Sequence, residues 1–455
     1  MSAPSASSGQ FGSRLGFILA AAGSAIGLGN IWRFPYSAGE NGGAAFVLVY
    51  LGFVVLIGLP VLLAELSIGR ASGKNPVGAF RELDPVKSGA WSRVGLLGVV
   101  TGFGILSFYS VIAGWTLSYL ARVLAGDFSG AMSPQTSKAI FMGIIANPFE
   151  VVAMSGVFLL LTGAVVRGGV SGGIERAAKV LMPLFFVILV VLAGRAVTLP
   201  NAEKGLAFLF SPDFSKLSGG AVMSALGQAL FSLSLGMGAM ITYGSYLQKK
   251  EALGAAGISV AAFDTMIALL AGLIIFPAMF SVGAEPSGAG PGLVFVAMPA
   301  IFDKLPAGQA FGVAFFALLA VAALTSTISL LEVVVAYLVG ERGWTRERAV
   351  WLATAVCFAL AVPSALSQGA VPGLGSDALG ESFLDWMNIL FGNITLAVGA
   401  LFIALFAGWR WGADKARQEM QGLPLAGAWS FAIRFLCPIA IVVIMVYMLA
   451  TGSFM

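Results

Sequence analysis

A series of eleven apolar segments constrains this chain more than any other feature, because each is long or nearly long enough to cross a lipid bilayer. Only 10% of the residues are charged, against about 25% in a soluble protein. The pattern predicts an all-α polytopic membrane protein and excludes an ordinary soluble enzyme. The segments lie at about residues 15–36, 43–68, 94–124, 151–166, 180–199, 221–247, 252–282, 311–339, 349–363, 383–411 and 426–450.

The composition also limits the chemistry that the chain can perform. It contains no histidine, which excludes histidine metal ligands, general bases and proton relays. The two cysteines, Cys357 and Cys437, lie inside apolar segments and are interpreted as small buried hydrophobic residues. The sequence shows no pairing of a nucleophile with a base, so we expect no enzyme. No nucleic acid partner is expected either.

The basic residues predict how the chain is oriented. With the N-terminus in the cytoplasm, 18 of the 25 lysines and arginines fall on the cytoplasmic side. This bias follows the positive-inside rule. An odd number of spans then places the C-terminus outside. We therefore expect a multi-pass protein of the plasma (inner) membrane, surrounded by the lipid bilayer.

Two of the apolar segments contain breaks. The first carries three glycines in the stretch 23–29, and the sixth carries the run Ser232-Leu233-Ser234-Leu235-Gly236-Met237-Gly238. Each glycine weakens a helix by about 1 kcal/mol relative to alanine. One explanation is close packing of helices. The other is a binding site, because paired breaks in two halves of a transporter mark the site where backbone groups meet the ligands.

Several motifs resemble the signature of the neurotransmitter:sodium symporter family, in its bacterial branch. The family resemblance covers the chain from about residue 14 to residue 434. The motifs are Arg14-Leu15-Gly16-Phe17-Ile18-Leu19, Gly27-Leu28-Gly29-Asn30-Ile31-Trp32-Arg33-Phe34-Pro35, Glu40-Asn41-Gly42-Gly43, Gln228-Ala229-Leu230-Phe231-Ser232-Leu233-Ser234-Leu235-Gly236 and Ala322-Ala323-Leu324-Thr325-Ser326.

The resemblance implies one transporter domain over residues 1–455, with eleven transmembrane helices. Helices 1 to 5 (about 12–199) and helices 6 to 10 (about 220–412) would form two inverted repeats. An extra helix would cover about 426–450, and helices 1 and 6 would be unwound in the middle of the membrane. The implied function is sodium-coupled import of hydrophobic L-amino acids, aliphatic and also aromatic, by alternating access in a monomer. The alternative is a channel or an amino acid sensor with the same broken helices, although a channel needs a continuous polar lining.

The resemblance also implies two Na⁺ sites built from hard oxygen ligands, which suit such a cation. The first would use Ala25, Asn30, Ser232 and Asp264. The second would use Gly23, Ile26, Ala322, Thr325 and Ser326. The two hydroxyls of the second site could instead bond to carbonyls of their own helix.

The implied substrate site lies between the same two breaks. Its members are Ala25, Leu28, Gly29, Ile105, Tyr109, Phe231, Ser232, Ser234, Met237, Thr327 and Leu330. Backbone N–H groups of Leu28 and Gly29 and the Tyr109 hydroxyl would bind the carboxylate. Family members that carry biogenic amines have an aspartate where this chain has Gly27, so a glycine leaves room for an amino acid's own carboxylate.

The gates are implied less completely. Arg33 would pair with Asp385 in an outer gate, since the position of the family's usual acidic partner falls on Asn388. The usual inner pair falls on Ser8 and Gly340, with only Glu341 close by, so no inner pair is predicted. Gly173 and Pro183 have the spacing of the family's helix-five unwinding motif. Glu65, inside the second span, is expected to bind N–H groups that the broken helices release.

Chloride dependence can also be predicted from the resemblance. Chloride-dependent members bind the anion next to the first Na⁺ with neutral side chains. This chain keeps Tyr50, Gln228 and Ser232 of that set, but it has Asp264 and Ala268 at the two remaining positions. A fixed carboxylate supplies the countercharge and repels an added anion. We therefore expect chloride-independent transport.

Overall fold

The structure of the protein is a computed structural model that describes residues 9–128, 132–286, 293–375, 380–420 and 426–451. Within these residues every regular element is a helix. The first half of the chain contains α1 (Arg14–Ala25), η1 (Gly29–Arg33), α2 (Phe34–Glu40), α3 (Ala44–Phe53), η2 (Val54–Gly58), α4 (Leu59–Ser72), α5 (Pro76–Leu83), α6 (Ser92–Ala125), α7 (Pro134–Ile145), α8 (Pro148–Arg167), η3 (Val170–Glu175), α9 (Arg176–Ala196), α10 (Ala202–Phe210) and η4 (Phe214–Lys216).

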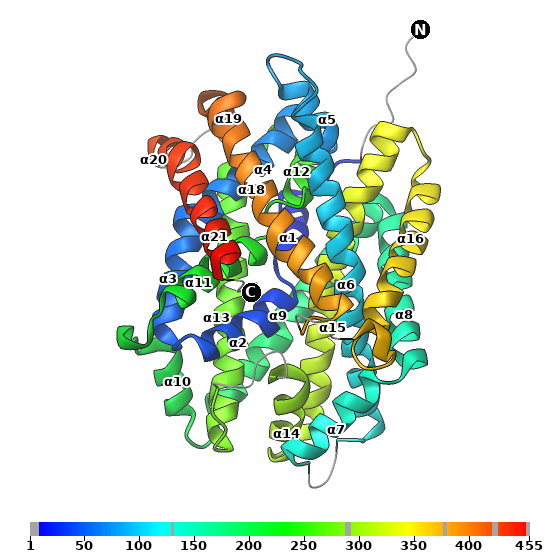
Figure 1. Cartoon of the computed structure of the whole chain (residues 1–455), viewed down its shortest axis with the longest axis vertical. Coiled ribbons are helices and arrows are strands. Elements are labelled where there is room, and N and C mark those ends of the chain that lie inside the picture. The colour runs from blue at the N-terminus through cyan, green and yellow to red at the C-terminus, as the bar shows by residue number, and fades with distance from the viewer. Residues whose placement is uncertain (1–8, 129–131, 287–292, 376–379, 421–425, 452–455) are drawn as a thin grey trace.

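The second half is built in the same way, from long helices joined by short ones (Figure 1). It contains α11 (Gly219–Ser232), α12 (Ala239–Ser245), α13 (Leu253–Ser281), η5 (Leu293–Ala297), α14 (Met298–Asp303), α15 (Gly308–Arg342), α16 (Arg346–Leu366), η6 (Pro372–Leu374), α17 (Phe383–Met387), η7 (Asn388–Thr395), α18 (Leu396–Leu405), η8 (Phe406–Arg410), α19 (Ala413–Glu419), α20 (Ala426–Phe431), η9 (Ala432–Leu436) and α21 (Cys437–Thr451).

Nine helices in the described part of the chain are long and apolar enough to cross a membrane. The helices at 14–25 and 29–40 meet at an angle of 51° and count as a tenth span if they act together. The sixth predicted span, 221–247, is divided into α11 and α12. Since each of these two helices is too short to be counted alone, the total of eleven stays a prediction.

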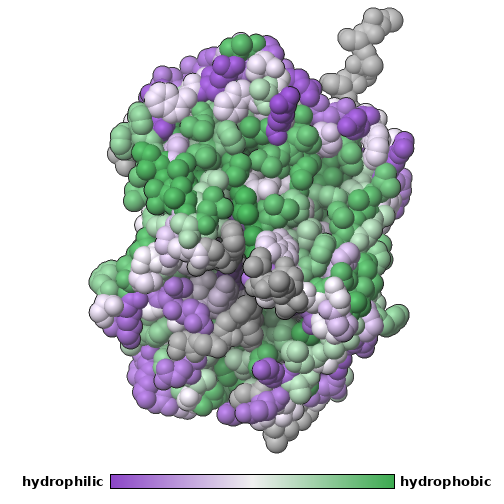
Figure 2. Space-filling model, viewed as in Figure 1, coloured by the Kyte–Doolittle hydropathy of each residue, from purple (hydrophilic) through white to green (hydrophobic). Residues whose placement is uncertain are grey.

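The surface agrees with a protein that sits in a bilayer. Hydrophobic residues cover much of the face between two ends where hydrophilic residues gather (Figure 2). Side chains such as Val55 on η2 and Val187 on α9 are 61% and 60% exposed. Such exposure of large apolar side chains on spanning helices is favourable in lipid.

The long helix α6 lies at the centre of the packing. It contacts α15, α8 and α5, and α18 also packs against it (Figure 1). The helix ends at Gly126, whose φ of +87° is the left-handed conformation that glycine adopts most easily. Of the two broken helices, the first packs mainly against α13, α15 and α9, and α12 of the second packs against α4.

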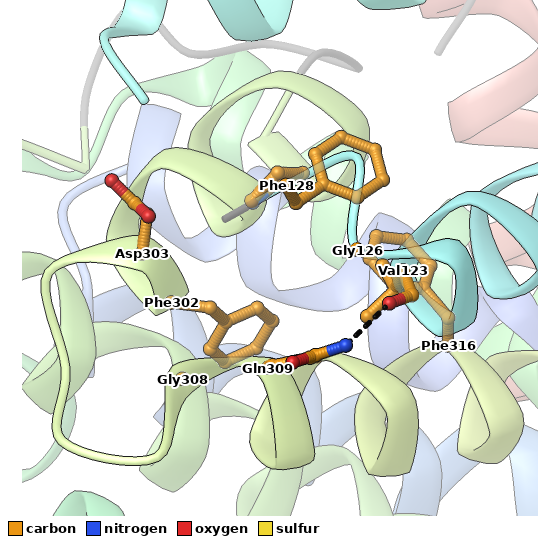
Figure 3. A pocket seen from close by; sticks show the side chains of 10 residues that line it. Val123, Gly126, Phe128, Phe302, Asp303, Gly308, Gln309 and Phe316 are labelled. Carbon is orange, nitrogen blue, oxygen red and sulfur yellow. Dashed lines mark hydrogen bonds between the residues drawn. The ribbon is translucent and has the colours of Figure 1, made fainter. Parts of the chain in front are cut away.

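Short helices lie at one end of the bundle. The Tyr119 hydroxyl of α6 donates to the Phe295 carbonyl over 2.6 Å, and this bond ties η5 to α6. Beside it, Val123, Phe302 and Phe316 border a cavity of about 10 Å³. Figure 3 shows Gln309 at this cavity, where its amide donates to the Val123 carbonyl over 3.3 Å. The volume is about that of one water molecule.

Candidate functional site

The two breaks lie side by side near the centre of the molecule. Helix α1 ends at Ala25, and α11 ends at Ser232. The Ser234 hydroxyl of the second break donates to the Ser24 carbonyl of the first over 2.9 Å. In the second break, Ser234, Gly236 and Gly238 have φ values of +54°, +81° and +77°. Three left-handed residues in five turn the backbone away from helical geometry, and this frees carbonyl and N–H groups for ligands.

Glu65 of α4 binds a backbone group that the break releases. Its carboxylate accepts a hydrogen bond from the Gly236 N–H over 2.7 Å, and its side chain is completely buried. An unpaired backbone N–H in hydrocarbon would cost several kcal/mol. Glu65 therefore stabilises the break between α11 and α12.

The side chains proposed for the first Na⁺ site meet in one buried group. Asn30 donates to Asp264 Oδ1 over 2.7 Å and to Ser232 Oγ over 3.1 Å. Ser232 in turn donates to Asp264 Oδ2 over 2.7 Å. Ala25 borders the cavity just beyond. The arrangement brings a carboxylate, an amide and a hydroxyl into mutual contact. Asn30 faces the other two through its amide nitrogen, and its amide oxygen accepts from the Gly27 N–H over 3.2 Å. The oxygen atoms of such groups suit a hard cation.

The residues proposed for the second Na⁺ site also come together, between α1 and α15. The Ser326 hydroxyl lies 3.3 Å from the Ile26 carbonyl, and the Thr325 hydroxyl lies 3.5 Å from the same oxygen. Thr325 also donates to the Ala322 carbonyl of its own helix over 2.9 Å. A methyl group on Gly23 would lie 3.2 Å from Thr325 Cβ. Thr325 therefore bonds to a carbonyl of its own helix, and it also lies close to the Ile26 carbonyl of the neighbouring helix.

A cavity of about 30 Å³ separates the breaks and is bordered by most of the proposed substrate residues. We call it the lower cavity. Eight of the eleven proposed residues line it: Ala25, Gly29, Ile105, Tyr109, Phe231, Ser234, Met237 and Leu330. Ser24, Gly27 and Ser326 complete the lining. The Leu28 N–H donates to the Tyr109 hydroxyl over 2.8 Å and so points at the proposed carboxylate position.

Thr327 is placed differently from the expectation. Its hydroxyl bonds to the Thr162 hydroxyl of α8 over 2.8 Å and donates to the Leu324 carbonyl over 3.0 Å. The residue is fully buried between helices and does not line the lower cavity. A neighbouring polar group on α8 therefore determines where this side chain points.

A second cavity of about 250 Å³ lies next to the lower cavity, on the side of Arg33 and Asp385, and we call it the outer cavity. Gly29, Tyr109 and Phe231 line both cavities and form the partition between them. Arg33 and Asp385, the two residues expected to form a gate, both border the outer cavity. The Arg33 guanidinium lies 4.6 Å from the centre of the Phe231 ring. The Asp385 carboxylate accepts from Ser382 over 2.6 Å.

The opposite end of the bundle is closed by polar contacts that the sequence did not reveal. Buried Glu332 of α15 forms an ion pair with Arg346 of α16. The Tyr246 hydroxyl donates to Glu332 over 2.7 Å, and the Phe11 N–H donates to the Tyr246 carbonyl over 3.2 Å. Arg346 and Glu332 are separated by a helix end and a turn, so no sequence motif joins them.

Glu341, the residue next to the expected inner-gate position, is paired elsewhere. Arg81 of α5 donates to its carboxylate over 2.7 Å, and Asn75 donates over 3.1 Å. Gly340 lies beside Asn75. Ser8 lies outside the described residues, so the structure does not test the family's usual inner pair.

The proposed unwinding segment of the fifth predicted span runs from a π-helical segment into α9. Gly173 lies in the π-helical segment η3, and Pro183 lies inside α9. Met182, next to this proline, faces the first break, because a methyl group on Gly23 would lie 3.1 Å from its sulfur atom. Glu175 accepts from the Gly12 N–H over 2.6 Å and so ties η3 to the segment before α1.

Comparison with known proteins gives a consistent answer. The profile of the Sodium:neurotransmitter symporter family matches residues 8–136 and 145–453. The uncharacterized sodium-dependent transporter YhdH of Bacillus subtilis is 38% identical over 450 residues, 98% of each chain. The sodium- and chloride-dependent GABA transporter ine of Drosophila melanogaster is 30% identical over 71% of this chain and 38% of its own. A crystal structure of MhsT in complex with L-phenylalanine matches with a TM-score of 0.88 and 47% identity, over 96% of this chain and 99% of that one.

The helical fold with two broken helices, together with these matches, is that of a sodium-dependent membrane transporter. The chain belongs to the Sodium:neurotransmitter symporter family. It is therefore a multi-pass membrane protein that uses sodium for symport, and it is not an enzyme. The fold is that of the MhsT structure.

Proposed function

We propose that the protein imports hydrophobic L-amino acids, aliphatic and aromatic, together with two Na⁺ ions and without chloride. The observation that carries this proposal is the lower cavity, which joins an apolar lining to the polar backbone of both broken helices. A zwitterionic substrate with an apolar side chain fits such a site. The complex of MhsT with L-phenylalanine supports the aromatic members of this substrate class.

The backbone polarity of the site supports binding of the amino acid's charged groups. The Leu28 N–H and the Tyr109 hydroxyl, 2.8 Å apart, would turn to the substrate carboxylate. Gly27 keeps that position clear. The amino group would meet carbonyls at the ends of α1 and α11, with the Ser234 hydroxyl nearby. Helix C-termini favour positive charge, so these ends suit an ammonium group.

The two ions would have different roles. The first would lie beside the substrate carboxylate and would couple ion binding to substrate binding. The second would join α1 to α15 through Ile26, Thr325 and Ser326, whose oxygen atoms lie close together. Its release would loosen α1 from the rest of the bundle. Met182 of α9 lies over this site. Unwinding between Gly173 and Pro183 would therefore expose the ion to the cytoplasm.

Asp264 supports chloride independence. Both of its carboxylate oxygens accept hydrogen bonds from proposed first-site ligands, Asn30 and Ser232. Tyr50 lies 3.5 Å from Ser232, and Gln228 donates to the Gly29 carbonyl. The side chains that would otherwise surround chloride are therefore grouped around a fixed negative charge. Na⁺-driven uptake should be equal in chloride and gluconate buffers, whereas Asp264→Asn combined with Ala268→Ser should make it chloride-dependent.

We further propose that one monomer in the plasma (inner) membrane performs transport, with the N-terminus in the cytoplasm and the C-terminus outside. Residues 12–199 and 220–412 would be the two inverted repeats, and 426–450 the extra helix. Arg33 and Asp385 would close the outer cavity over bound substrate. Their shared position at this cavity supports the pairing.

A competition panel tests the proposed substrate class. Each of the twenty amino acids is added in excess to purified protein with one radiolabelled hydrophobic amino acid, in Na⁺ buffer and in K⁺ buffer. We expect competition from hydrophobic amino acids only, and binding only in Na⁺. Equal competition by charged amino acids would contradict the proposed specificity.

A further inference from the structure

The face of α6 that borders the lower cavity extends beyond it to two glycines, Gly98 and Gly102. Gly98, Gly102, Ile105 and Tyr109 follow the three- and four-residue spacing that places side chains on one side of a helix. Ile105 and Tyr109 line the lower cavity. The two glycines lie on the same face, next to the broken stretch between α11 and α12.

Gly102 lies against two groups that define the end of this cavity. A methyl group at this position would lie 3.2 Å from the Met237 carbonyl oxygen and 3.7 Å from Leu330 Cδ2. Both Met237 and Leu330 line the lower cavity. The first distance is shorter than a relaxed carbon–oxygen contact, so a side chain here would force one of the two residues to move.

The broken stretch cannot move away from α6 to make room. On its far side, Gly236 is in direct backbone contact with α18, where a methyl group on Gly399 would overlap the Gly236 carbonyl. A methyl group on Gly236 would lie 2.9 Å from the Ala400 nitrogen. The Gly236 N–H is also bound to Glu65. Added volume at Gly102 would therefore be taken from the lower cavity.

We propose that Gly102 determines the largest side chain that the transporter accepts, although its own atoms do not line the cavity. The missing side chain lets the Met237 backbone lie close against α6, and this keeps Met237 out of the space that an aromatic ring would need. This inference rests on the proposed function, because it concerns the side-chain end of the same amino acid site. It adds a specificity-determining position on α6 outside the cavity lining.

The test compares Gly102→Ala with Gly98→Ala, a matched change one helical turn away. A methyl group on Gly98 would lie 3.3 Å from the Gly238 nitrogen and 3.5 Å from the Met237 carbonyl carbon, the second an ordinary contact, and would meet no side chain of the lower cavity. Unlabelled alanine, leucine and phenylalanine compete with radiolabelled leucine for purified protein in Na⁺ buffer. We expect Gly102→Ala to weaken phenylalanine about tenfold relative to alanine, because one methylene in an apolar pocket discriminates at about that level. Gly98→Ala should leave the ratio unchanged.

Three outcomes test the proposed role of Gly102. An unchanged ratio of phenylalanine to alanine in Gly102→Ala, or an equal shift in both glycine variants, would overturn the inference. If Gly102→Ala unfolds, the double variant with Leu330→Ala supplies the measurement, and restored phenylalanine binding supports the proposal while persistent loss contradicts it. If the wild type binds no amino acid in Na⁺ buffer, the proposed function itself is wrong.

Discussion

At the scale of single residues, Gly27 leaves open the space that an amino acid's carboxylate would need. A methyl group there would lie 2.5 Å from Ser326 Oγ and 2.7 Å from the Tyr109 hydroxyl. Overpacking of this kind costs about 1–3 kcal/mol, so we expect Gly27→Ala to weaken amino acid binding about tenfold or more. Gly27→Asp should abolish it, because two carboxylates would then share one small site.

The control for this prediction is Gly52→Ala, since a methyl group on Gly52 has open space around it. Competition binding in Na⁺ buffer measures both variants. Wild-type affinity in Gly27→Asp would show that the carboxylate binds elsewhere.

A second residue, Asp84, follows the end of α5 and makes the stability of the fold depend on pH. Burial alone would raise the pKa of Asp84, but hydrogen bonds from Arg410, from the Ser88 side chain and from two backbone N–H groups outweigh this effect and lower the pKa to about 2. The Arg410 contact is 2.7 Å long. Because the folded pKa lies below the ordinary value of 3.8, the carboxylate stabilises the fold at neutral pH. That contribution to stability is lost as the pH falls from 3.8 to about 2.

We expect Asp84→Asn to lower the free energy of unfolding by about 2 kcal/mol at pH 7, the contribution of a charged hydrogen bond. Thermal unfolding in detergent at pH 7, 5 and 3 measures the difference from wild type, which should narrow at pH 3. Asp414→Asn is the control, because the Asp414 side chain is 77% exposed. A difference that grows toward pH 3 would contradict the assigned sign.

At the scale of helices, Pro183 is expected to control the release of the second Na⁺. A proline inside a helix removes one hydrogen bond and weakens the preceding turn by about 3 kcal/mol. Pro183→Ala should therefore stabilise α9 in its helical form and slow transport about tenfold while amino acid binding is preserved. Turnover in proteoliposomes and equilibrium binding separate the two effects. Pro363→Ala, which changes a proline inside α16, is the matched control. Full turnover in Pro183→Ala would rule out the unwinding role.

The helices themselves were largely predictable, because a bilayer demands long apolar segments. The expected span 94–124 is α6 (Ser92–Ala125), and the expected span 426–450 runs from Ala426 to Thr451. Side-chain directions were less predictable, since spanning helices are apolar on several faces and periodicity does not distinguish cavity from neighbour. Thr327 points to α8 for this reason. The Glu332–Arg346 pair depends on how two helices pack, and that packing is not encoded in local spacing.

At the scale of the whole molecule, polar contacts around Glu332 close the end of the bundle that lies opposite the outer cavity. Because Glu332 is fully buried, removing its partner leaves an uncompensated charge, which costs about 3–5 kcal/mol. We expect Arg346→Ala to loosen this end and to speed hydrogen exchange of the segment 11–17. Glu347→Gln, which breaks an exposed pair with Arg167, should leave exchange unchanged. Equal exchange in wild type and Arg346→Ala would show that the pair does not hold the end closed.

The central claim is that a sodium gradient drives hydrophobic amino acids through the site between the two broken helices. The most direct measurement is uptake of radiolabelled L-phenylalanine and L-leucine into proteoliposomes that contain only this protein. We predict accumulation above the external concentration when Na⁺ is high outside and K⁺ is inside, and its collapse when an ionophore dissipates the Na⁺ gradient. Equal uptake with K⁺ on both sides would contradict the account.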